Sequence, residues 1–111
     1  MFAVSDETLR KAVDAIVEEA DPAQIILFGS RARGDAKPES DYDLLVVVEG
    51  AFGAHRSRYR EMAKLCRALA RLPLPEDILL FTREEVEYWR DSLNHVVARA
   101  LREGKVLYER Q

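Results

Sequence analysis

The sequence predicts an α+β fold, in which a small mixed sheet of about four strands is covered by helices. Short apolar segments rich in β-branched residues alternate with segments whose apolar residues recur at helical spacing. Proline and glycine residues separate many of these segments. The length of 111 residues and the hydrophobic share of 48% suit a single globular domain spanning residues 1–111. The expected order is α-β-β-α-β-α-β.

The first part of the chain predicts one helix and two strands. Ser5 is a good N-cap, and the residues after it form an apolar stripe of Leu9, Ala12, Val13, Ile16, Val17 and Ala20. Asp21-Pro22 ends this helix. Residues 24–28 are apolar on both faces and predict a central strand. Residues 41–48 predict a second strand that is entered through two acids.

A second helix and a third strand are expected next. Residues 54–72 have helical periodicity, with a predicted inner stripe of Tyr59, Met62, Ala63, Cys66, Leu69 and Ala70. Pro73 and Pro75 end the helix. Residues 77–81 are apolar after an initial acid and predict the third strand.

The last part of the chain predicts a helix and a short edge strand. Thr82 and Glu85 have the spacing of a capping box. The predicted apolar stripe contains Val86, Trp89, Leu93, Val96, Val97, Ala100 and Leu101, with a break near Asp91. Gly104 suits the C-terminal cap, and residues 106–108 predict the edge strand.

Charge and cysteine content narrow the function classes. The net charge of −3 argues against a surface for non-specific duplex binding. One helix face carries Arg56, Arg60, Lys64, Arg67 and Arg71, which indicates a solvated face or a dock for an acidic partner more than a nucleic-acid surface. The single cysteine, Cys66, excludes an internal disulfide and is expected to be buried. With no membrane-length apolar run and no secretory signal, we expect a cytoplasmic protein without membrane contact.

Three polar features indicate chemistry. Gly29-Ser30 follows the first strand, where a glycine lets the backbone approach an oxyanion and a hydroxyl can donate to it; alone, this pair is more often a simple turn. Asp41 and Asp43 lie two apart on a strand and so share a face, although such a pair also caps loops. Asp77 begins another strand, and a third carboxylate joins the pair if the two strands are neighbours. Carboxylates at an open site suit Mg²⁺.

The segment FGSRARGDAKPESDYDLLVV resembles the signature of the DNA polymerase beta-like nucleotidyltransferase superfamily, a Gly-Ser followed after ten residues by Asp-x-Asp. Its closer form is similar to the minimal nucleotidyltransferase (MNT) group, as is the ending REGKVLYER. The resemblance runs from about Ile25 to Tyr108. It is specific at Gly29, Ser30, Gly34, Ser40, Asp41 and Asp43, and less so at Asp77.

The resemblance implies a magnesium-dependent nucleotidyltransferase. Gly29 and Ser30 would hold the β- and γ-phosphates of a nucleoside triphosphate. The catalytic carboxylates would be Asp41 and Asp43, which bind two Mg²⁺, and Asp77, which binds the ion that activates the nucleophile. An acceptor hydroxyl would attack the α-phosphorus in line, with pyrophosphate leaving. Among the basic loop residues Arg31, Arg33 and Lys37, Arg33 is favoured as a phosphate contact.

The MNT group also implies a partner. Its members are similar to antitoxins that silence HEPN-type ribonuclease toxins by transferring AMP from ATP onto a toxin tyrosine, and we take this as the leading hypothesis. The chain has no residues left for the helical domain that larger relatives carry, so the acceptor site is expected to come from a partner. Two alternatives stay open: a non-catalytic module that inhibits by occlusion, and a nucleotidyltransferase that acts on RNA or a small molecule with a partner subunit. Self-association is also open.

Overall fold

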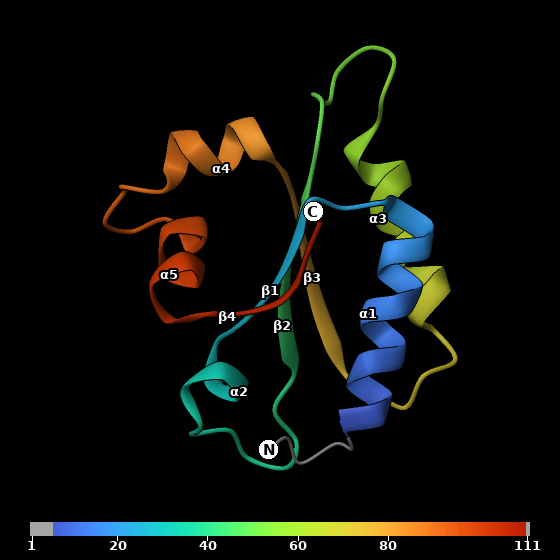
Figure 1. Ribbon diagram of the computed structural model, residues 1–111, viewed down its shortest axis with the longest axis vertical. Helices are drawn as coiled ribbons and strands as arrows, with labels where there is room; N and C mark the ends of the chain where they lie inside the picture. Colours follow the sequence, from blue (N-terminus) through green and yellow to red (C-terminus); the bar gives the residue numbers. More distant parts are fainter. Residues whose placement is uncertain (1–5, 111) are drawn as a thin grey trace.

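A four-stranded mixed sheet lies at the centre of the computed structural model, which describes residues 6–110 (Figure 1). The strands are β1 (Gln24–Phe28), β2 (Tyr42–Val48), β3 (Glu76–Thr82) and β4 (Lys105–Glu109). Their order in the sheet is β3-β2-β1-β4. Strand β1 is antiparallel to both β2 and β4, whereas β2 and β3 are parallel. The predicted α+β fold is confirmed.

Helices cover both faces of the sheet (Figure 1). On one face lie α1 (Asp6–Ala20) and α3 (Arg58–Leu69), and on the other lie α4 (Arg83–Trp89) and α5 (Val96–Glu103). A single helical turn, α2 (Ser30–Arg33), follows β1 and was not predicted as a helix. The predicted break near Asp91 is confirmed, because it separates α4 from α5. The predicted capping box of Thr82 and Glu85 opens α4.

Strand alternation divides the apolar residues into two cores. Leu44, Val46 and Val48 pack with α1 and α3, while Leu45 and Val47 pack with α4 and α5. The predicted stripe of α1 is confirmed, with Leu9, Ala12 and Ile16 buried in the first core. The N-cap predicted at Ser5 lies outside the described residues.

The predicted inner face of α3 is confirmed at Leu69 and Met62 but wrong at its other four positions. Leu65 and Leu69 are the buried residues, with Met62 packed beside them, whereas Tyr59 is 89% exposed and Cys66 is exposed too. Ala63 and Ala70 are also exposed. Two apolar stripes are possible on this helix, and the one with two leucines buries more apolar area. The helix is therefore turned toward Leu65, which leaves the cysteine in solvent.

Two further expectations about surface residues need correction. Arg56 precedes α3 and hydrogen bonds to Glu61, so it does not belong to the row of cations on that helix. Leu93 is 85% exposed, because it lies in the turn between α4 and α5 and not on a helix.

Gly104 caps α5 as predicted, but in extended conformation with φ −84° and ψ 168°, not in the left-handed conformation of a common glycine cap. The backbone passes directly from α5 into β4, which requires an extended residue. A Cβ at this position would lie 2.5 Å from Ile26 Cγ2, so the glycine is required by close packing.

None of the helices within residues 6–110 combines the length and the apolar character that crossing a bilayer requires.

Candidate active site

One end of the sheet presents carboxylates where the rest of the same face is apolar. The register pairs Phe28 with Asp43 across β1 and β2, and Asp43 with Asp77 across β2 and β3. Paired residues on neighbouring strands point to the same face, so both carboxylates lie on the face that α4 and α5 cover further along. The sequence predicted that Asp77 would join the other acids if its strand neighboured theirs. Strands β2 and β3 are neighbours, so Asp43 and Asp77 lie together.

A pocket of about 560 Å³ opens at this end of the sheet. Its polar wall combines the two carboxylates with Gly29, Ser30 and Arg33, and Phe28, Leu79 and Val96 supply apolar surface. Arg99 and Glu103 of α5 complete the lining. Of the six predicted site residues, five line the pocket; Asp41 does not.

Gly29 is required by two independent features of the pocket. Its φ of 75° and ψ of −158° fall in a region that only glycine adopts readily. A Cβ at Gly29 would also overlap the Asp43 carboxylate, with Asp43 Cγ at 3.1 Å. Because Gly29 has no side chain, the Asp43 carboxylate can occupy the space beside it, next to the turn that leads into Ser30.

The first turn of α2 leaves backbone donors near this glycine. Ala32 and Arg33 donate their N–H groups to Gly29 O, both at 3.0 Å. The preceding N–H groups, at Ser30 and Arg31, are in the first turn of the helix and have no partner within it by geometry. Ser30 thus presents a backbone donor and a hydroxyl at the edge of the pocket.

Negative charge accumulates at Asp43. Burial raises the pKa of the Asp43 carboxyl, and the charges of Asp77 and Asp41 raise it further, while Arg33 acts in the opposite direction. Asp41 is exposed and its charge also raises the pKa of Glu76, although burial is the larger cause there. Asp41 therefore lies close enough to raise the pKa of Asp43 by its charge, although it does not line the pocket.

The donor set fits Mg²⁺ better than a metal held by protein alone. Within residues 6–110, no three His, Cys, Asp or Glu side chains lie together closely enough to hold an ion. Mg²⁺ is usually bound by one or two carboxylates together with substrate phosphates. Asp43 and Asp77 repel each other and lie beside the Gly29 backbone, which a phosphate can approach, so they match that arrangement. A cation between them would relieve the repulsion that contributes to the raised pKa of Asp43.

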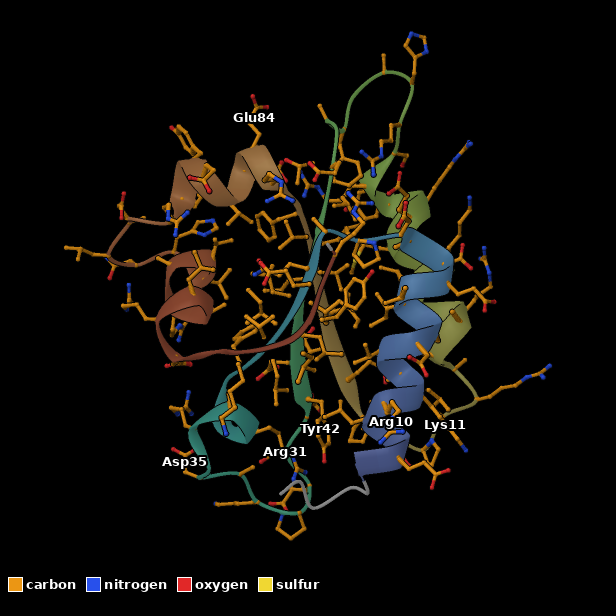
Figure 2. The ribbon with its side chains drawn as sticks, viewed as in Figure 1. Arg10, Lys11, Arg31, Asp35, Tyr42 and Glu84 are labelled. Carbon is orange, nitrogen blue, oxygen red and sulfur yellow. The ribbon has the colours of Figure 1, made fainter. Side chains whose placement is uncertain are left out.

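The two arginines of the Gly29–Gly34 segment have different surroundings. Arg31 is buried, donates to Pro38 O at 3.1 Å and to Ser40 O at 2.9 Å, and its guanidinium lies 4.4 Å from the centre of the Tyr42 ring. Figure 2 shows Arg31 beside Tyr42, at the end of the sheet where β2 begins. Arg31 is therefore a clamp on the loop that leads to Asp41, and its buried position does not suit a phosphate contact. Arg33 lines the pocket, and its contact with phosphate stays a prediction, whereas Lys37 is exposed.

Sequence reasoning missed the wall that α5 contributes. Val96, Arg99 and Glu103 are separated by three and four residues, so they share one helix face, and this face borders the pocket. Glu103 accepts a hydrogen bond from Arg33 at 2.9 Å, which ties α5 to α2. The available signal was this helical spacing of polar residues next to an apolar stripe.

This combination of a mixed sheet, a glycine-serine turn and facing carboxylates defines a nucleotidyltransferase. The chain belongs to the family described as Nucleotidyltransferase domain, whose model matches residues 7–107. It is 39% identical over 57 residues to a Methanocaldococcus jannaschii protein named "Putative protein adenylyltransferase". That match covers 51% of this chain and 52% of the relative, so the chain spans about half the length of the curated protein.

Solved structures share the fold. A crystal structure described as "a putative nucleotidyltransferase from Sulfolobus solfataricus" superposes with a TM-score of 0.59 at 18% identity, covering 99% of this chain and 94% of that one. A crystal structure of a toxin-antitoxin with AMP-PNP gives a TM-score of 0.56 at 23% identity, covering 92% of this chain and 73% of that one. These similarities confirm the nucleotidyltransferase fold.

Proposed function

We propose that this protein is a magnesium-dependent nucleotidyltransferase that moves AMP from ATP onto a hydroxyl of a partner protein and thereby acts as an antitoxin. The observation that carries the proposal is the pairing of Asp43 with Asp77 beside Gly29 in one pocket. The family membership supports transferase chemistry. The name of the archaeal relative supports a protein acceptor, and the toxin-antitoxin neighbour supports a toxin partner.

The proposed roles of five residues follow from their positions in the pocket, whereas that of Asp41, which does not line the pocket, rests on the effect of its charge on Asp43. Gly29 leaves the backbone open to the triphosphate, and Ser30 donates its hydroxyl to a phosphate oxygen. Arg33 is the proposed phosphate contact at the same end of the pocket, where Asp35 and Glu103 already accept hydrogen bonds from its guanidinium. Asp41, Asp43 and Asp77 are the proposed ligands of two Mg²⁺ ions, with Asp77 accepting the proton of the attacking hydroxyl. When bound, the metal would neutralise the charge that develops on the transferred phosphorus and on the leaving pyrophosphate.

The acceptor that we propose is a tyrosine of a HEPN-type toxin. Asp77 is exposed at the rim of the pocket, so an acceptor hydroxyl can approach it from outside this chain. The proposed attack joins the tyrosine oxygen to the α-phosphorus and breaks the bond from that phosphorus to the bridging oxygen of pyrophosphate. Asp77 takes the phenolic proton. The partner supplies the acceptor hydroxyl in this scheme, so the chain itself need not provide an acceptor residue.

The test combines the protein with Mg²⁺, ATP and the product of its neighbouring gene, and then weighs that partner. We expect mass increases in multiples of one AMP unit, and none with Asp43→Asn, which keeps the shape of the side chain but removes a carboxylate. If the two proteins bind and the partner mass stays unchanged, transfer to protein is wrong.

The same variant separates transfer from occlusion. If Asp43→Asn neutralises the toxin as well as the natural protein does, inhibition needs no chemistry and the chain acts as a binding module. If AMP appears instead on an RNA or a small molecule in the reaction, the nucleotidyltransferase assignment holds and the protein acceptor does not.

A further inference from the structure

The two guanidinium groups of the pocket differ in how far their charge is already neutralised. Arg33 donates from Nη1 to Glu103 Oε1 at 2.9 Å and from Nε to Asp35 Oδ2 at 3.2 Å. These two carboxylates raise the pKa of Arg33, with the hydrogen bond to Asp35 as the largest cause. An arginine held between two acids has little net charge to offer an incoming anion.

Arg99 lies in the same pocket without such partners. Its side chain is exposed and lines the pocket from α5, and no ion pair or side-chain hydrogen bond involves it in the described part of the chain. Glu103, one turn further along α5, has the spacing to pair with it but accepts from Arg33 instead. An acid that follows a base is also the weaker order for an i,i+4 pair.

The charges that remain in the pocket explain why an unpaired arginine matters. Arg33 and Glu103 neutralise each other, which leaves Asp43 and Asp77 as negative groups and Arg99 as the positive one. A triphosphate that approaches two carboxylates is repelled unless cations offset them. Metal ions would offset the charge near the carboxylates, and a forked guanidinium suits the phosphates beyond them because it donates two parallel hydrogen bonds.

We infer that Arg99 binds the phosphate tail of the nucleoside triphosphate from the α5 side of the pocket. The inference rests on the proposed function, and it adds a substrate-binding residue that lies 70 positions after the glycine-serine turn. It assigns α5 the recognition of the tail, so nucleotides without the β- and γ-phosphates do not engage it.

The test measures the binding of ATP and of AMP, each with Mg²⁺, by isothermal titration calorimetry. Arg99→Ala should weaken ATP binding by roughly ten- to hundredfold, the usual effect of losing hydrogen bonds between charged groups. Binding of AMP should change by less than about threefold, because AMP lacks the tail. Arg99→Lys should recover part of the loss, since lysine keeps the charge but not the fork.

Arg102→Ala is the matched control, because Arg102 is exposed on the same helix and does not line the pocket. It should bind ATP like the natural protein, and both alanine variants should unfold at the same urea concentration. Equal ATP affinity in Arg99→Ala and the natural protein would overturn the inference, as would equal losses for ATP and AMP. If the natural protein itself binds no ATP with Mg²⁺, the proposed function fails first, which the first titration reveals.

Discussion

Replacing Gly29 with alanine tests how the glycine-serine turn and the Asp43 carboxylate depend on each other. The substitution adds one methyl group at φ 75° and ψ −158°, a conformation that alanine avoids. The same methyl group would overlap the Asp43 carboxylate. Because a carboxylate is the movable end of a side chain, it should turn away from Gly29, and the position that we propose for a metal ligand is lost.

The expected magnitudes separate stability from binding. Strain of this kind costs about 1–3 kcal/mol, less than the roughly 5–15 kcal/mol that holds a domain folded, so Gly29→Ala should remain folded. A ligand present at a hundred times its Kd stabilises the folded state by about 2.7 kcal/mol. We expect the natural protein to gain about that much from Mg²⁺ with a non-hydrolysable ATP analogue, and Gly29→Ala to gain almost nothing.

Gly34→Ala provides a control of similar strain but different surroundings. Gly34 also has a positive φ, 87°, yet a Cβ there would meet no atom within 4 Å. Its cost should be about 1–2 kcal/mol, and its gain from the ligand should match that of the natural protein. Urea unfolding with and without ligand measures both quantities. An equal gain of stability from the ligand in Gly29→Ala and Gly34→Ala would show that the Asp43 position does not depend on Gly29.

Three further predictions concern residues around the site. Arg31→Met removes the donors to Pro38 O and Ser40 O but keeps a side chain of similar volume, so it should lower the free energy of unfolding, measured in urea, by about 2–4 kcal/mol. The control Lys37→Met should change that free energy by less than about 0.5 kcal/mol. Equal effects of the two substitutions would contradict the role of Arg31 as a clamp. Because burial and neighbouring carboxylates raise the pKa of Asp43, the folded state binds its proton more tightly than the unfolded state. In EDTA, the natural protein should therefore lose stability relative to Asp43→Asn as pH rises from the ordinary aspartate pKa of about 4 through the raised value, and a difference independent of pH would be evidence against this account. Gly104→Ala should lower the free energy of unfolding by about 1–3 kcal/mol, because the new Cβ crowds Ile26. Gly53→Ala should not be destabilised by crowding, since no atom lies within 4 Å of a Cβ there. Equal thermal stability of the two variants would show that the packing at Gly104 is loose.

The strands and the place of Asp43 at the start of β2 could be predicted because both depend on local pattern. Strand β2 has apolar residues on both faces after Asp43, but the predicted alternation does not extend to Asp41, which precedes the strand and does not line the pocket. The pairing of Asp77 with Asp43 depends on a parallel contact between strands that a helix separates in sequence. The sequence identifies Asp77 as a third acid, but it does not give the register in which β3 pairs with β2.

The surface of α3 shows where pattern reasoning fails. Tyr59, Cys66 and two alanines form a stripe that is as regular as the one containing Leu65 and Leu69. Packing against α1 and the sheet selects between them, and it selects the larger aliphatic side chains. Helical period alone does not carry that information.

The pocket wall on α5 and the buried Arg31 were missed for a related reason. Arg99 reaches the pocket because α5 packs against β1, a contact between segments about 70 residues apart, and the Arg33–Glu103 hydrogen bond joins α5 to α2. Arg31 looks like an ordinary loop cation in sequence, and only the folded loop places carbonyl groups and the Tyr42 ring around it. Charged residues near a motif are assigned to it too readily when their burial is unknown.

The most direct test of the site uses Mn²⁺ in place of Mg²⁺ and records which backbone amide signals of the protein it broadens by NMR. With an ATP analogue present, the signals of Gly29, Ser30, Asp43 and Asp77 should broaden first. Signals of Lys64 and Cys66, on the opposite side of the sheet, should stay sharp at the same Mn²⁺ concentration. Broadening centred on α3, or none near Asp43 and Asp77, would contradict a metal and triphosphate site at this end of the sheet.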